Sequence, residues 1–173
     1  MFHQWHKFVF LSLWAIQTIC FGNPQIKIHL DQAKEFEEND QLEEAIESAK
    51  KAISKIDRQT DDTQVLEANK LLIRLSYDSE NYTDTIKYAQ SLIGKDKSND
   101  AQFFGRRYLG HAFMDSNRSK KAIRQYETAL KISSKDKEGE ANIYFNLGGV
   151  FWDLEDFNKS KESFAACISL IEG

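Results

Sequence analysis

Residues 141–173 read ANIYFNLGGVFWDLEDFNKSKESFAACISLIEG, and this stretch decides the fold. Its first half places large and small apolar residues at i, i+3, i+4 and i+7, which is one face of a helix. These residues are Tyr144, Leu147, Gly148 and Phe151. A polar break follows, and a second helical pattern starts at Phe157. The stretch therefore predicts two helices joined by a tight turn.

The same two-helix pattern recurs upstream in the chain. The position in each second helix that favours a small side chain recurs at spacings of 40, 37 and 38 residues, in Ala45, Thr85, Ala122 and Ser160. A polar dipeptide separates the two helices of each segment, as expected for a turn. These dipeptides are Asn39-Asp40, Glu80-Asn81, Ser116-Asn117 and Glu155-Asp156. The sequence thus predicts four helix pairs.

Small and large residues alternate in the first helix of each pair. A small residue lets the second helix approach closely, and a large residue one turn later fills the remaining gap. The small residues are Ala33, Gly110 and Gly148, and the large ones are Phe36, Phe113 and Phe151. The second segment departs from this rule, because Ile73 occupies the small position. No single pair can bury its apolar face alone, so the pairs are expected to stack.

This combination of spacing, turns and small residues resembles the tetratricopeptide repeat, most clearly in the last two segments. The resemblance implies an all-α fold, a right-handed superhelical stack of antiparallel helix pairs over residues 23–173. The expected repeats span 26–57, 66–94, 103–134 and 141–172. Their spacing exceeds the period of about 34 residues that is usual for the family, and the surplus lies in polar connections.

Composition agrees with an interaction domain and offers no chemistry. The single proline and the 29% of charged residues favour helices, and the net charge of −4 without a basic block argues against nucleic acid as a partner. Outside the first 22 residues only His29 and His111 remain as histidines, with no cysteine or histidine at ligand spacing. The sequence therefore predicts no enzyme, no metal site and no cofactor.

The first 22 residues differ from the rest of the chain. Residues 8–21 are uncharged and mostly apolar, a length that suits a signal peptide better than a membrane span of about 20 residues. Cleavage after Gly22 would export the protein to the periplasm or the outside of the cell. An uncleaved membrane anchor is the alternative. Cleavage would also remove Cys20 and leave Cys167 as the single thiol.

The resemblance places the working surface on the concave side, lined by the first helices. Carried over position by position, it predicts a groove with a basic middle and an aromatic end. The predicted groove residues are Lys34, Lys70, Arg74, Tyr77, Arg107, His111, Phe145, Asn146 and Trp152. Such a groove would suit a peptide with acidic side chains or a free carboxylate. The alternative is that the basic residues merely pair with surface acids.

The last helix ends with apolar residues that no further helix of the repeat pattern would cover, including Ile168 and Ile171. This predicts a surface for a partner or for a homo-oligomer. We therefore expect a non-catalytic scaffold or adapter of the cell envelope. The alternative is the sensory region of a membrane signalling protein, such as a sensor kinase or a transcriptional regulator, whose output domain lies outside this chain.

Overall fold

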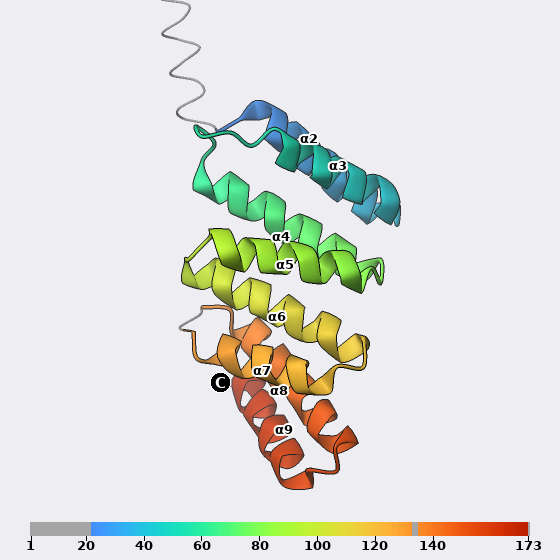
Figure 1. Cartoon of the computed structure of the whole chain (residues 1–173), viewed down its shortest axis with the longest axis vertical. Helices are drawn as coiled ribbons and strands as arrows, with labels where there is room; N and C mark the ends of the chain where they lie inside the picture. The colour runs from blue at the N-terminus through green and yellow to red at the C-terminus, as the bar shows by residue number, and fades with distance from the viewer. Residues whose placement is uncertain (1–21, 133–134, 173) are drawn as a thin grey trace, which may run out of the picture. The chain divides into compact units, whose positions relative to one another are not determined.

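The computed structural model describes residues 22–132 and 135–172, and in these residues every regular element is an α-helix (Figure 1). The helices are α2 (Pro24–Glu38), α3 (Leu42–Ser54), α4 (Asp62–Asp78), α5 (Tyr82–Lys95), α6 (Asn99–Asp115), α7 (Ser119–Leu130), α8 (Lys137–Asp153) and α9 (Phe157–Glu172). The predicted all-α fold of helix pairs is confirmed. The predicted signal peptide lies outside the described residues.

The chain divides into two compact units, with the boundary between Leu75 and Ser76 inside α4. In the first unit, α2 packs against α3 through small and apolar side chains that are fully or nearly fully buried. These are Ile26, Leu30, Ala33, Ala45, Ala49 and Ala52. Three alanines on one face of α3 let the two helices approach closely, as the small positions in the sequence predict.

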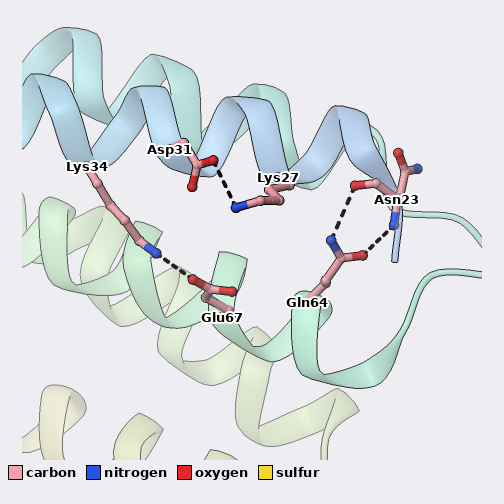
Figure 2. Close-up of polar contacts among 6 residues, drawn as sticks. All are labelled: Asn23, Lys27, Asp31, Lys34, Gln64 and Glu67. Atoms are coloured by element: carbon pink, nitrogen blue, oxygen red, sulfur yellow. Dashed lines mark hydrogen bonds and ion pairs between the residues drawn. The ribbon is translucent and has the colours of Figure 1, made fainter. Parts of the chain in front are cut away.

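Polar contacts join α2 to α4 within the first unit (Figure 2). The backbone N–H of Asn23 donates to Oε1 of Gln64 over 2.7 Å, and Nε2 of Gln64 donates back to the Asn23 carbonyl over 3.2 Å. Further along, Nζ of Lys34 lies 2.6 Å from Oε1 of Glu67. The side chain of Gln64 thus gives the N–H of Asn23, at the N-cap of α2, a partner that the helix itself does not provide.

Glycines allow close packing in the second unit. The Tyr126 ring of α7 lies against Gly110 of α6, and the Phe164 ring of α9 lies against Gly148 of α8. A third close approach joins α5 to α6, where a Cβ atom on Gly105 would lie 2.8 Å from Cγ1 of Ile93. The predicted role of Gly110 and Gly148 is therefore confirmed.

Every turn inside a helix pair has the same backbone geometry. Its central residue has a positive φ of 57–59°, although none is glycine: they are Asp40, Glu80, Asn117 and Glu155. The next N–H donates to a carbonyl five residues earlier, as from Asp156 to Phe151 over 2.9 Å. This bond ends each first helix in a Schellman motif. The four predicted turns are confirmed.

No helix in the described ranges has both the length and the apolar composition needed to cross a bilayer.

Candidate partner-binding site

The second unit contains a polar pocket of about 510 Å³ between α6, α8 and the end of α4. Its lining includes four of the predicted groove residues, Tyr77, Arg107, His111 and Asn146. The other lining residues are Asp78, Tyr108, Asp136, Glu138 and Asn142. The sequence pattern did not identify these five, because it considered only the groove-facing register of first helices.

His111 of α6 is the buried centre of this pocket. Its Nδ1 atom lies 2.7 Å from the hydroxyl of Tyr126 in α7 and 3.1 Å from Nδ2 of Asn146 in α8. Burial, and secondarily the nearby Arg107 charge, lowers the pKa of His111 to about 3. The ring is therefore neutral near pH 7 and connects three helices through one nitrogen.

The other ring nitrogen of His111 is free to bind a ligand. Its Nε2 atom forms no hydrogen bond with the described residues, since both bonds of this ring involve Nδ1. Among the described residues, the sole fully buried side-chain nitrogen or oxygen atom without a hydrogen-bond partner is Nε of Arg106. Nε2 of His111 is therefore not fully enclosed by protein, and the ring lines the pocket.

Tyr77, at the end of α4, forms an aromatic wall of the pocket. Its ring lies 5.7 Å from Tyr108 and 5.6 Å from His111, measured between ring centroids. Its hydroxyl donates to Oδ2 of Asp115 over 2.7 Å. Burial, followed by this hydrogen bond, raises the pKa of Tyr77, so the hydroxyl stays protonated.

Arg107 is held by contacts inside the pocket. Its Nη1 atom lies 2.8 Å from Oδ2 of Asp136, and its guanidinium lies 5.5 Å from the centroid of the Tyr108 ring. Asp136 also accepts a hydrogen bond from the backbone N–H of Gly139 over 2.7 Å, which caps α8. The ion pair therefore fixes the connection that precedes α8 against α6.

Two of the predicted basic residues of the first unit also have acidic neighbours. Lys34 pairs with Glu67, and Arg74 of α4 pairs with Glu37 of α2 through two contacts, one of 2.9 Å between Nη2 and Oε2. Lys70 is half-buried on α4. These residues belong to the unit before Ser76, whereas the pocket belongs to the unit after it.

The predicted aromatic residues lie on the last helix pair, outside the polar pocket. Phe145 and Trp152 expose 59% and 61% of their surface. Phe145 lines a second, apolar pocket of about 510 Å³ beside Ala141, Cys167, Leu170 and Ile171. Phe157, Ile168 and Ile171 are also exposed, as the pattern of the last helix predicts.

Within the described ranges, no group of three or more His, Cys, Asp and Glu side chains could hold a metal ion.

Comparisons with known proteins agree with this architecture. The family model described as "Tetratricopeptide repeat" matches residues 109–136 and 141–173. Two crystal structures of MamA are similar to this chain. The first has 21% sequence identity and a TM-score of 0.66, and the match covers 87% of this chain and 81% of that chain. The second has 20% sequence identity and a TM-score of 0.65, and the match covers 86% of this chain and 74% of that chain.

A third structure, "MamA MSR-1 C2", has 13% identity, covers 85% of this chain and 77% of that chain, and gives a TM-score of 0.62. At these identities the likeness concerns the fold. No curated protein matches the sequence.

Proposed function

Because the chain carries tetratricopeptide repeats, we propose that it is a non-catalytic adapter that binds a segment of a partner protein in the pocket around His111. The observation that supports this proposal most directly is the convergence of Tyr77, Arg107, His111 and Asn146 on one recess. Buried polar atoms with defined directions provide specificity, and the aromatic rings provide contact area.

The adapter acts in the cell envelope in this proposal. Residues 8–21 support it, because an uncharged apolar segment of this length is typical of an export signal. Fractionation and N-terminal sequencing of the native protein test the location: we expect a mature chain that starts at Asn23 and is found outside the cytoplasm. A full-length chain recovered from the cytoplasm would contradict this part of the proposal.

The sequence predicts a guest with acidic side chains or a free carboxylate, and this stays a prediction for the basic residues of the first unit. In the first unit it depends on Lys34, Lys70 and Arg74. Lys34 and Arg74 already have acidic neighbours, so an acidic guest would have to compete with Glu67 and Glu37 there.

The adapter function is tested by affinity purification from the envelope fraction with matched variants. Asn146→Arg fills the pocket with a long side chain from α8, whereas Glu127→Arg places the same side chain on an exposed position of α7. We expect a set of proteins that bind the wild-type chain and Glu127→Arg but are lost with Asn146→Arg. Identical sets for all three chains would reject the pocket as the binding site.

Self-association through α9 is a second part of the proposal, with a second copy of this chain as the occupant. Ile93 of α5 packs against Gly105 of the following helix α6. Ile168 occupies the equivalent position in α9 and is 53% exposed. The position equivalent to Gly105 in α2 is Ile28, which is 47% exposed. The two exposed faces therefore occupy the positions of the two halves of a repeat-to-repeat contact. We propose that α9 of one copy packs against α2 of the next, with the Ile28 side chain holding these two helices further apart than α5 and α6 are at Gly105.

Sedimentation velocity tests the self-association. The chain should form concentration-dependent oligomers, and Ile168→Lys should return it to a monomer, because an ammonium group cannot be buried in an apolar contact without a partner. Lys161→Glu, on a polar part of α9, serves as the control. A wild-type chain that stays monomeric at concentrations of about 100 μM would contradict this contact.

A further inference from the structure

We propose that the pocket around His111 selects its partner segment by a basic side chain, the guanidinium of arginine or the ammonium of lysine. This inference depends on the proposed adapter function and names the chemistry of the guest. Its basis is the set of charges and hydrogen-bond donors that line the pocket.

The charges of the pocket favour a cation. Asp78, Asp136 and Glu138 contribute three carboxylates to the lining, whereas Arg107 contributes one guanidinium. Asp136 lies 2.8 Å from that guanidinium and offsets it. Glu138 is exposed and forms no ion pair with the residues that the structure describes. A guest carboxylate would therefore meet net repulsion, and a guest cation would meet net attraction.

His111 adds no positive charge to this balance. Its pKa of about 3 keeps the ring neutral near pH 7. Asp115 adds a further negative charge behind the wall of the pocket, where it accepts the hydrogen bond from Tyr77. The neutral ring and the additional carboxylate both favour a positively charged guest.

The backbone of the guest finds donors in the same pocket. Nδ2 of Asn146 lies 3.1 Å from Nδ1 of His111, and because an amide nitrogen can only donate, this contact favours the tautomer of the neutral ring with its proton on Nε2. The ring itself lines the pocket. Nδ2 of Asn142, one turn before Asn146 in α8, forms no hydrogen bond with the described residues. Both groups can donate hydrogen bonds to the carbonyl oxygens of an extended peptide. The carboxylates of the pocket then remain available for the basic side chain of that peptide.

The aromatic wall suits the remainder of a basic side chain. Tyr77 and Tyr108 present rings that can contact the aliphatic stem of lysine or arginine, or stack with a guanidinium. Arg107 already occupies such a place, since it lies over the rings of Phe104 and Tyr108 at 5.6 and 5.5 Å. The lining thus combines carboxylates, carbonyl-directed donors and aromatic faces.

The test uses three capped heptapeptides of alanine and serine that differ only at the central residue, which is arginine, glutamine or glutamate. Binding to the full chain is followed by NMR through the side-chain amides of Asn142 and Asn146, which detects weak affinities. We expect the arginine peptide to bind about three to ten times more tightly than the glutamine peptide, and the glutamate peptide to bind most weakly. The preference for arginine should shrink as salt rises, because exposed charges are screened.

Variants of the protein locate the effect. The double substitution Asp78→Asn and Glu138→Gln keeps the size of both side chains and should bring the arginine and glutamine peptides to similar affinities. Glu127→Gln, an exposed carboxylate on α7, should leave the preference intact. A glutamate peptide that binds as tightly as the arginine peptide, or a preference that survives the double substitution, would overturn the inference.

The adapter function and the charge preference fail in different ways. If envelope partners are lost with Asn146→Arg while the glutamate peptide binds best, the adapter function stands and the preference for a basic guest is wrong. If none of the three peptides changes the amide signals of Asn142 and Asn146, peptide binding in this pocket is rejected together with the preference.

Discussion

Gly148 and Phe164 are neighbours because Gly148 has no side chain: a Cβ atom there would lie 2.6 Å from Cε1 of the Phe164 ring. A Cβ atom on Gly149, the next residue of α8, would have nothing within 4 Å. The two adjacent glycines therefore have different reasons to be present, and they form a matched pair for substitution.

Gly148→Ala should lower the free energy of unfolding by about 1–3 kcal/mol, because the added methyl group forces the Phe164 ring away from α8. Gly149→Ala should raise it by up to about 1 kcal/mol, because alanine restricts the unfolded chain and favours the helix. Chemical denaturation of both variants measures the two values. Equal effects would show that the α8–α9 contact does not depend on Gly148.

The turn residues with positive φ offer a gain in stability. Glu80 and Glu155 adopt φ near 58°, a conformation that is unfavourable for residues with a Cβ atom. Glu80→Gly and Glu155→Gly should each raise the free energy of unfolding by about 0.5–1 kcal/mol. The melting temperature of each variant provides the measurement.

The neighbouring residue in the last turn gives a contrast. Asp156 accepts a hydrogen bond from the backbone N–H of Lys159 over 3.2 Å at the start of α9. Asp156→Ala should therefore lower the free energy of unfolding by about 0.5–2 kcal/mol. If Glu155→Gly also lowered the free energy of unfolding, the positive φ of Glu155 would not be a source of strain.

The stability of the fold should depend on His111 in acid. Its folded pKa of about 3 lies below the ordinary value of 6.5, so the unfolded chain binds a proton more readily than the folded chain. The contribution of the neutral ring is complete above pH 6.5 and is lost as the pH falls from 6.5 towards 3. The slope in this window is at most about 1.4 kcal/mol per pH unit.

His111→Gln should flatten this part of the pH dependence, because glutamine does not titrate and retains a polar contact for Tyr126. Denaturation curves between pH 3 and 8 give the free energy of unfolding of both proteins. The difference between the two values reports on residue 111, because both proteins contain the same carboxylates. A difference that stays constant with pH would show that His111 is not neutralised by folding.

The hydroxyl of Ser160 in α9 replaces the alanine found at the same position of two other pairs. It donates to the carbonyl of Gly148 over 2.8 Å and is buried. Ser160→Ala should cost about 0.5–1.5 kcal/mol of unfolding free energy. Ser160→Leu should cost more, since the buried contact with α8 has no room for the added carbons. Calorimetry of both variants distinguishes the hydrogen bond from the packing.

The sequence predicted the parts of the fold that repeat. Small residues such as Gly110 and polar turn residues such as Asn117 follow local rules. One repeat is therefore enough to identify these positions, and the other repeats support the assignment. Gly94 shows the limit of a local rule: glycine commonly follows the last residue of a helix, but α5 continues through Gly94 to Lys95 and its cap is Asp96.

The site was predicted only in part, for a physical reason. The register of the first helices was enough to find Arg107 and His111, which face the pocket from α6. The charge of the pocket depends on Asp136 and Glu138, which come from the connection and first turn of the following pair. No local pattern shows that Asp136 lies beside Arg107, because the contact spans 29 residues of chain.

Two of the three carboxylates that line the pocket therefore belong to a different repeat from Arg107 and His111. Removing the final helix pair would take away Asp136 and Glu138 together, and it would leave Arg107 without its ion-pair partner. Of the charged lining residues, Asp78 and Arg107 would then remain, and their charges cancel although no residue of α6 had changed. In such an array, losing one unit at the end is enough to neutralise a recess that the neighbouring unit helps to build.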